Sequence, residues 1–251
     1  TSAGGAITAL KIDGTASQDV TLISTGGGTN TVVVGAIGTV TLNGINTVAL
    51  TGSTLITLNG SITTDTATGN SVTVTGPAKL GASITVDTSA NVTDTTGTVN
   101  FTGVVNGAAA NTQSLTITSG AGAVTMGGAI GNTADLLALT INSAAGAGTI
   151  DLDNIGAGLA GVTGNTLIGN AATATIDFNG TIYKTTGSQT YTAATGTNLN
   201  VLGAGAPVAF TSANTAIAFA TSDIKLGPSA NLTVTSAGGA ITALKIDGTA
   251  S

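Results

Sequence analysis

The amino-acid sequence predicts an all-β fold of the parallel β-helix (β-solenoid) type. Three observations support this prediction: apolar and polar residues alternate in short stretches, clusters rich in glycine and asparagine separate these stretches, and the first seventeen residues return unchanged as the last seventeen. Strict alternation is typical of a half-buried strand. Self-similarity at a fixed spacing is typical of repeat proteins that stack one structural unit on the next.

The alternating stretches can be followed along the whole chain. In Ser71–Thr75, two valines alternate with Ser and Thr, and pairs of the same kind occur at Val40/Leu42, Val48/Leu50, Ile84/Val86, Val99/Phe101, Leu115/Ile117, Leu139/Ile141, Ile150/Leu152, Ile176/Phe178, Leu199/Val201, Ile224/Leu226 and Leu232/Val234. Charged residues such as Lys11, Asp177 and Lys225 stand at the polar positions. Because successive side chains of a strand point to opposite faces, we expect an apolar core and outward-facing charges.

The segments between the predicted strands have the composition of tight corners. Clusters such as 26–30 and 68–70 contain Gly, Asn and Thr, and glycine and asparagine accept the positive φ values that such corners need. Helix formers are scarce: only residues 133–139 could form a helical turn, and no helix is predicted there. An immunoglobulin-like sandwich would need an aromatic core, whereas the chain contains only four Phe and two Tyr.

Residues 1–17 and residues 235–251 both read TSAGGAITALKIDGTAS. This identity indicates a tandem array in which residues 1–234 form one β-solenoid repeat unit and residues 235–251 are the start of the next identical repeat. We therefore expect the two copies to have near-identical backbones, related by a translation along the axis and a twist. The alternatives are an overlap introduced at the two ends and a chain that happens to carry matching ends. With about 20 residues per coil and about 4.8 Å between stacked strands, one unit would make about 11 coils and a rod of about 50 Å.

The composition excludes several classes of function. Cys, His, Trp, Arg and Glu are absent, charged residues are 6% of the chain, and the net charge is −6. Without His or Cys, the chain lacks an imidazole base and the usual ligands of zinc, copper and haem. An acidic chain is a poor partner for nucleic acid, and no apolar run has the length of a membrane helix. We therefore expect no enzyme activity, no catalytic residue, no cofactor and no membrane insertion.

Asp151 and Asp153 are the candidate acidic pair, because residues two apart in a strand share one face. Enzymes that cleave polysaccharides use paired carboxylates, but no basic residue lies nearby in the sequence, which favours an outward pair that keeps the rod solvated. Asp151, Asp153 and Asn154 are also the candidate ligands for an isolated calcium ion, which prefers carboxylate and amide oxygens.

Two further motifs have simpler explanations. Gly156, Gly158 and Gly161 form a GxGxxG motif with Asp177 downstream, the spacing of a dinucleotide-binding loop. Glycine is frequent enough for the motif to arise by chance, and no helical pattern follows it, so no dinucleotide site is predicted. Repeated Thr-x-Thr pairs resemble the surface of ice-binding solenoids, but their spacing is irregular, and Thr is a favoured polar residue of strands.

Residues 107–144, which contain the cadence QSLTITSGAGAVTMGGAIG, and residues 185–194 (TTGSQTYTAA) resemble the repeats of giant secreted bacterial β-strand-repeat proteins. These are the β-helical adhesins of the filamentous-haemagglutinin and autotransporter types. The resemblance implies a right-handed parallel β-helix, export across the bacterial envelope and a place at the cell surface. It brings no catalytic residues with it.

The expected function is therefore that of a non-enzymatic structural protein, which forms an extracellular filament, sheath or adhesin stalk from tandem repeats. Its expected partners are further copies of itself, joined end to end or laterally, together with neighbouring cells or surface glycans. Two alternatives stay open. One is an adhesin repeat that binds a glycan or host protein through an outward face, with Tyr183 and Tyr191 as a stacking platform. The other is a polysaccharide-processing β-helix that uses Asp151 and Asp153.

Overall fold

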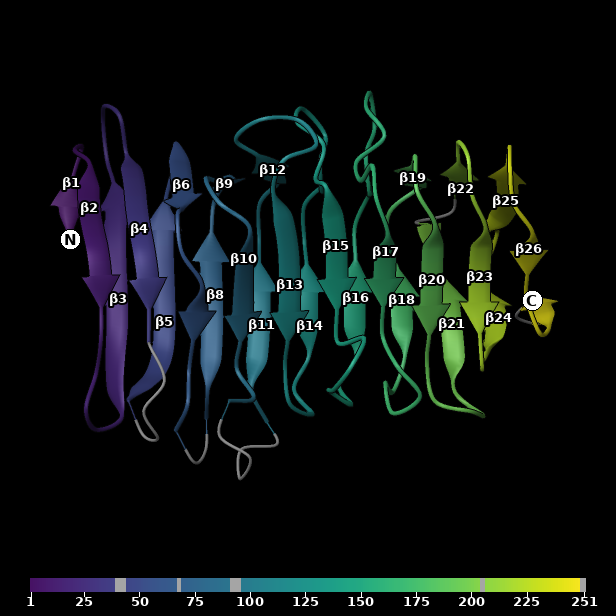
Figure 1. Cartoon of the computed structure of the whole chain (residues 1–251), viewed down its shortest axis with the longest axis horizontal. Coiled ribbons are helices and arrows are strands. Elements are labelled where there is room, and N and C mark those ends of the chain that lie inside the picture. The colour runs from purple at the N-terminus through teal and green to yellow at the C-terminus, as the bar shows by residue number, and fades with distance from the viewer. Residues whose placement is uncertain (39–43, 67–68, 91–95, 204–205, 249–251) are drawn as a thin grey trace.

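The computed structural model describes residues 1–38, 44–66, 69–90, 96–203 and 206–248. In this part of the chain all regular elements are strands, and they pair in parallel and stack from the N-terminal to the C-terminal end as a solenoid of about nine turns (Figure 1). The prediction of an all-β parallel β-helix is confirmed. Residues 133–139, the one segment that could have formed a helical turn, instead form bends, a β-bridge at Leu136 and the start of β15 (Ala138–Ile141).

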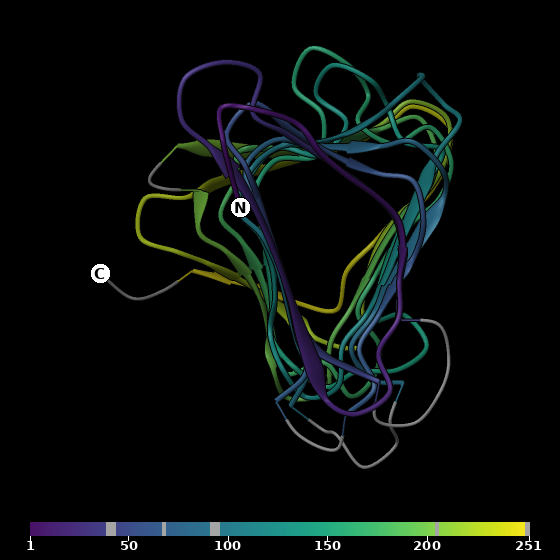
Figure 2. The same cartoon turned by 90° about the vertical axis from the view of Figure 1, so that its left-hand side faces the viewer.

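Each turn of the solenoid has three faces, which give it a triangular outline when it is viewed along its axis (Figure 2). The first face is a sheet of eleven strands in the described residues. Its strands are β1 (Ser2–Ala3), β3 (Gln18–Thr25), β5 (Ile45–Gly52), β8 (Ser71–Thr75), β11 (Thr98–Phe101), β14 (Val124–Met126), β16 (Ile150–Leu152), β18 (Ile176–Phe178), β21 (Asn198–Val201), β24 (Asp223–Leu226) and β27 (Ile246–Gly248).

The chain next passes through the second face and then the third. The second face contains β6 (Leu55–Leu58), β9 (Ala78–Leu80), β12 (Val105–Gly107), β19 (Ile182–Thr185), β22 (Pro207–Ser212) and β25 (Asn231–Ser236). Bridges through Ile130 and Ile155 connect β12 with β19. The third face contains β7 (Ile62–Thr63), β10 (Ile84–Asp87), β13 (Ser114–Thr118), β15 (Ala138–Ile141), β17 (Thr166–Ile168), β20 (Gln189–Thr192), β23 (Ile217–Ala220) and β26 (Ile241–Thr242).

Two strands near the N-terminus run across both of these faces without a corner. They are β2 (Ile7–Ile12) and β4 (Thr31–Ile37), which pair with each other. On its other side β4 pairs with β6 of the second face and, through Ile37, with β7 of the third face. A straight strand therefore stacks directly on a turn that has a corner.

The turns are longer than the sequence suggested. Ser2 pairs with Ser24, 22 residues later, whereas Ile84 pairs with Leu115, 31 residues later. The prediction of about 20 residues per coil and 11 coils per unit is therefore wrong: 234 residues make about nine turns, or about 45 Å of rod at the spacing of stacked strands. Three corners per turn, some of them extended into loops, account for the additional residues.

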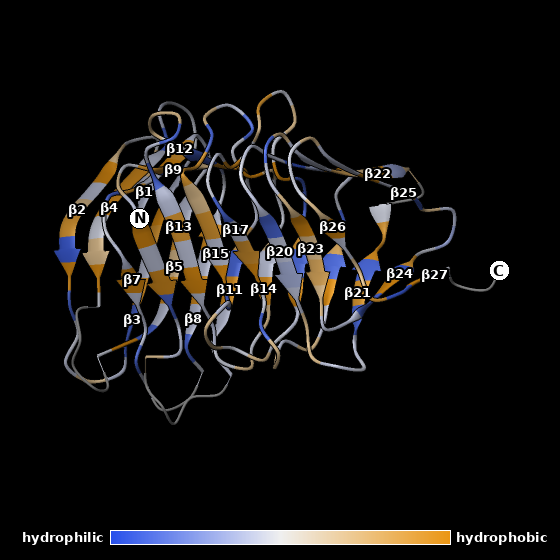
Figure 3. Cartoon of the chain, turned by 45° about the vertical axis from the view of Figure 1, so that its right-hand side comes forward, coloured by the Kyte–Doolittle hydropathy of each residue, from blue (hydrophilic) through white to orange (hydrophobic). Residues whose placement is uncertain are grey.

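The core consists of aliphatic ladders that run along the axis. On the first face one ladder contains Val48, Val72, Val99, Val124, Ile150, Ile176, Leu199 and Ile224, each paired with the next. All eight are buried, and hydrophobic residues alternate with hydrophilic ones along the strands (Figure 3). Every predicted apolar pair within the described residues lies in a strand, and Val40/Leu42 lies outside them.

Columns of glycine allow neighbouring turns to approach at the corners. Between the first and second faces, a Cβ atom on Gly103 would collide with the carbonyl oxygen of Gly76 in the preceding turn. Between the third and first faces, a Cβ atom on Gly122 would collide with the carbonyl oxygen of Gly97. The frequent glycines are therefore required by the close approach of stacked backbones.

The two copies of the seventeen-residue segment do not have the same backbone, contrary to the expectation from a tandem array. In the first copy Ile7–Ile12 is one strand, because it pairs with the straight strand β4. In the second copy the corresponding residues form β26 and β27, separated by a corner at 243–245. This corner is needed because β26 pairs with β23 on the third face and β27 with β24 on the first.

Candidate functional site

The outward side of the first face carries two carboxylates stacked in neighbouring turns. Asp151 of β16 is the Cα partner of Asp177 of β18. Thr125 precedes them in the same outward ladder, and Asn200 and then Lys225 follow. From the sequence, Asp153 was the expected neighbour of Asp151 on this face. In the structure Asp177 lies beside Asp151, because the turn between β16 and β18 keeps these two strands in register.

The surroundings of the two carboxylates differ. Asn200 Nδ2 donates a hydrogen bond to Asp177 Oδ1 at 2.6 Å. Asp151 Oδ2 accepts a long hydrogen bond from Thr125 Oγ1, at 3.5 Å. Burial raises the pKa of Asp151 from its ordinary value, and the negative charge of Asp177 raises it further. The ladder therefore holds one carboxylate with a direct amide donor and one whose ionised form is disfavoured by its surroundings.

The lysine of this outward ladder lies away from the two aspartates. Lys225 is two strands beyond Asp177, and its Nζ atom contacts Asp247 Oδ2 at 3.4 Å. Asn200 lies between Lys225 and Asp177. The geometry is that of a polar outward strip with two adjacent acidic positions, and it places no lysine against the two aspartates.

Asn154, a candidate calcium ligand, supports the fold of the next turn. Its Oδ1 atom accepts hydrogen bonds from the backbone N–H groups of Thr181 and Ile182, both at 2.8 Å. These two bonds fix the start of β19. In the part of the chain that the structure describes, no three Asp, Glu, His or Cys side chains gather into a possible metal site. Calcium binding at Asp151, Asp153 and Asn154 is untested and can be measured directly.

The two tyrosines are buried in the core. Tyr183 and Tyr191 both have an exposed fraction of 0%. This excludes the alternative in which they form an outward stacking platform for a glycan, and it gives them a structural role in the core. In β20 the inward positions are Gln189 and Tyr191, and the aromatic ring buries a large apolar surface that aliphatic residues supply elsewhere in the core.

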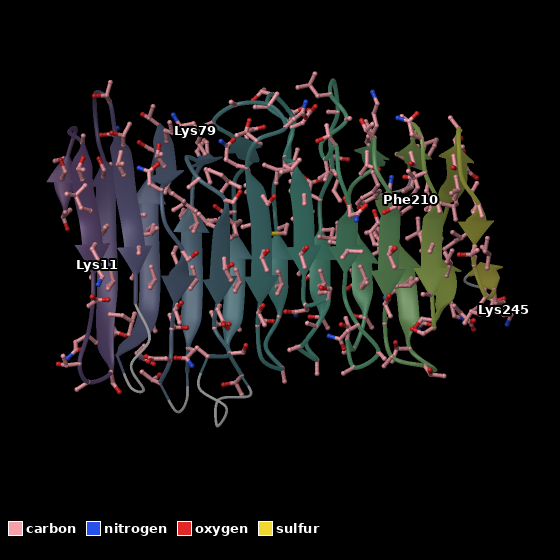
Figure 4. All side chains as sticks on the ribbon, viewed as in Figure 1. Lys11, Lys79, Phe210 and Lys245 are labelled. Carbon is pink, nitrogen blue, oxygen red and sulfur yellow. The ribbon has the colours of Figure 1, made fainter. Side chains whose placement is uncertain are left out.

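Five aromatic rings form one cluster inside the C-terminal turns, composed of Phe178, Tyr183, Tyr191, Phe210 and Phe219. Phe178 packs edge to face against Tyr191, with ring centroids 4.9 Å apart. Tyr183 stacks on Phe210 at 4.6 Å, and Phe210 is labelled in Figure 4. The rings occupy the space between the three faces and so belong to the core rather than to a binding site.

The buried hydroxyl groups have partners. Tyr183 Oη donates to the carbonyl oxygen of Leu152 at 3.0 Å and accepts from the N–H of Gly180 at 2.9 Å. Tyr191 Oη donates to Gln189 Oε1 at 2.9 Å. Burial raises the pKa of both tyrosines above the ordinary value of 10.0. Neutral, hydrogen-bonded phenols are the form that an apolar core accepts.

The GxGxxG segment forms a compact loop. Gly156 and Gly161 have φ values of 70° and 75°, and a Cβ atom on Gly161 would collide with the backbone N–H of Gly156. After this loop the chain enters a β-bridge at Val162. The glycines therefore close a corner of the solenoid, where a dinucleotide-binding loop would lead into a helix N-terminus.

Threonines stack on the outward side of the third face over part of its length. Thr85, Thr116 and Thr140 are successive partners in β10, β13 and β15. Leu167 follows in the same ladder. The threonine column is therefore short and is interrupted by an apolar side chain, in agreement with its interpretation as a set of favourable strand residues.

Comparisons of the chain with protein-family models, with curated proteins and with solved structures find no match. No helix in the described residues is long and apolar enough to cross a membrane. The fold is nevertheless clear from the strand pairing alone: the chain is a parallel β-solenoid of the kind found in β-helical repeat proteins.

Proposed function

We propose that the chain is one repeat of a non-enzymatic structural protein that forms an extracellular cell-surface filament, sheath or adhesin stalk. The observation that carries this proposal is the exact return of seventeen residues after 234 positions, in a fold that grows by adding turns. Each turn of a solenoid contacts only its neighbours, so identical units can follow one another without limit.

The ends of the solenoid support this proposal. In the described residues, β2 pairs on one side with β4, and β26 pairs on one side with β23. Ile241 and Ile246, at the C-terminal end, have exposed fractions of 47% and 53%. Open strand edges with exposed apolar side chains can pair with further strands. A following repeat would pair with these strands and cover these side chains.

The flanks of the solenoid are suited to contact with other copies. The chain has a net charge of −6 over 251 residues, so mutual repulsion between rods is small.

The segments at 107–144 and 185–194 resemble secreted repeats of the filamentous-haemagglutinin and autotransporter types. On this resemblance we extend the proposal to export by bacteria and to a role in adhesion or biofilm.

Electron microscopy of the native, full-length protein tests the proposal. We expect uniform filaments with an axial repeat of about 45 Å per unit, which is nine turns at the spacing of stacked strands. Immunogold labelling of intact cells should place them on the outer surface. A gene with a single copy of the unit, or soluble monomers that cleave a polysaccharide and lose this activity on Asp151→Ala substitution, would contradict it.

A further inference from the structure

The two copies of the seventeen-residue segment occupy different faces of the solenoid. In the first copy, Ser2 lies on the first face, Ile7 on the second and Ile12 on the third. In the second copy, the equivalent residues Ser236, Ile241 and Ile246 lie on the second, third and first faces. Every residue of the segment has advanced by one face. Lys11 and Lys245, an equivalent pair, mark the two ends of the rod in Figure 4.

The number of strands on the first face accounts for this advance. From β1 to β24 the first face contains ten successive strands in the described residues, which amount to nine full turns. The chain then passes to β25 on the second face, where Ser236 lies. A unit of 234 residues therefore makes nine turns and one further face.

The two copies together show both neighbours of the same segment. The second copy shows the turn that precedes it: Ile241 pairs with Ile217, and Ile246 with Ile224. The first copy shows the turn that follows it: Ile7 pairs with Val32, and Ile12 with Ile37. In a continuous array the segment would have all four partners.

The combined arrangement continues the core without a break. It places Ile246 between Ile224 and Ile37 of the next unit, and Ile241 between Ile217 and Val32 of the next unit. These four partners are all buried in the structure, with exposed fractions of at most 1%. The isoleucines that are half exposed at the C-terminal end would thus be covered on both sides.

The corner at 243–245 is compatible with a straight strand on top of it. In the described structure β4 runs straight from Thr31 to Ile37 and stacks on β6 and β7, which are separated by a corner of the same length at 59–61. The next unit's β4 can therefore stack on β26 and β27 in the way that β4 stacks on β6 and β7.

We infer that successive units of the array are rotated about the fibre axis by one face, that is, by one third of a turn in addition to the twist of the solenoid. This inference rests on the proposed tandem filament and names its end-to-end partner, the next copy of this chain. The outward ladder of Asp151 and Asp177 would then point in three directions in three successive units. Apart from the twist, the ladder would return to its starting face after three units, or about 135 Å, which is 28 turns at the spacing of stacked strands.

Cysteine cross-linking distinguishes this rotation from an unrotated array. The chain contains no Cys, so two introduced residues are the only thiols. In the rotated array residue 247 is the partner of residue 225, as in β27 and β24. In an unrotated array, residue 246 would lie on the third face, as its equivalent Ile12 does. The last residue of the ladder that begins at Ile12 is Phe219, so residue 246 would pair with residue 219 and residue 247 with residue 220. Parallel neighbours lie about 4.8 Å apart, within the range of a disulfide.

At one internal junction of the full-length protein, Lys225→Cys would be introduced in one repeat and Asp247→Cys in the segment that begins the next repeat. The matched control would carry Ala220→Cys with Asp247→Cys at the same junction. We expect the first pair to oxidise to a disulfide in most molecules and the second to remain free, as read by mass spectrometry of non-reduced peptides. A disulfide in the control pair, or in neither pair, would overturn the rotation even if filaments form. Cross-linking of the first pair in protein that forms no filaments would instead overturn the proposed function alone.

Discussion

Asp151 lies directly beside Asp177 on the outward side of the first face, one turn of the solenoid away. Two carboxylates at the spacing of parallel strands repel each other when both are ionised. Burial of Asp151 adds to this cost, and the pKa of Asp151 is raised by both effects. The ladder is therefore a place where the fold tolerates an unfavourable charge, and its contribution depends on pH.

Asp151→Asn should stabilise the protein at neutral pH. A group whose pKa is raised on folding contributes stability below its ordinary pKa, here 3.8, and this contribution is lost as the pH rises through the raised value. We therefore expect a gain of about 0.5 kcal/mol in the free energy of unfolding at pH 7, and none below about pH 3.8. Urea titrations at the two pH values measure it.

Asp153→Asn is the matched control, because it removes the same charge from a residue that follows the same strand and lies outside the stacked pair. An equal gain from both substitutions would mean that the net charge of the rod, rather than the stacking of Asp151 on Asp177, is responsible.

The tyrosines should ionise only when the protein unfolds. Burial raises the pKa of Tyr183 and Tyr191, so the stability that their neutral forms provide is complete below pH 10.0 and is lost as the pH rises further. The chain has two Tyr and no Trp, so the absorbance of phenolate reports on these residues alone. We expect it to rise together with the loss of the β-sheet circular dichroism signal. A reversible rise near pH 10 with the sheet intact would show that a tyrosine is exposed.

Tyr191→Phe should cost more stability than Tyr183→Phe. Removal of the Tyr191 hydroxyl takes away the donor to Gln189 Oε1 in a side chain that is fully buried, and an orphaned buried acceptor costs about 1–3 kcal/mol. When Tyr183 loses its hydroxyl, the Leu152 carbonyl still accepts from the N–H of Asn179 at 2.8 Å. The N–H of Gly180, which also bonded the hydroxyl, keeps a longer bond to the same carbonyl at 3.3 Å, so we expect a loss of about 1 kcal/mol. Thermal unfolding of both variants gives the order, and the reverse order would contradict this account.

The alternation of residues was sufficient to predict strands, an apolar core and the β-solenoid, because side-chain direction in a strand depends only on parity. The same parity marks Tyr191 as inward, since it matches Gln189 and differs from Thr190 and Thr192. The exception is Gln189, a polar side chain that faces inward. It is tolerated in the core because its amide group donates to and accepts from buried neighbours.

The stacking of Asp151 on Asp177 could not be predicted in the same way. It depends on the number of residues in one turn, which varies from 22 to 31 between the pairs Ser2–Ser24 and Ile84–Leu115. Loops at the corners set this number, and they carry no periodic pattern. The direction of side chains within a strand can therefore be predicted from this sequence, whereas the pairing of residues in neighbouring turns is known only from the structure.

Gly122→Ala should destabilise the solenoid, whereas Gly158→Ala should not. A methyl group at position 122 meets the carbonyl oxygen of Gly97 in the preceding turn, and a methyl group at position 158 meets nothing within 4 Å. Overpacking against backbone costs about 1–3 kcal/mol, measurable as a lower urea midpoint. Equal midpoints for the two variants would mean that the turns separate readily at this corner and that glycine is not required there.

Removal of divalent cations should leave the melting temperature unchanged. Asn154 Oδ1, one of the candidate calcium ligands, already accepts two backbone hydrogen bonds at 2.8 Å. Asn154→Ala should therefore destabilise the protein equally in chelator and in calcium, by about 1 kcal/mol for each part-buried N–H that loses its partner. Asp153→Ala serves as the neighbouring control. A bound ion at 100 times its Kd would add about 2.7 kcal/mol, so a rise in the melting temperature with calcium that disappears in Asp151→Asn would establish a metal site at this corner.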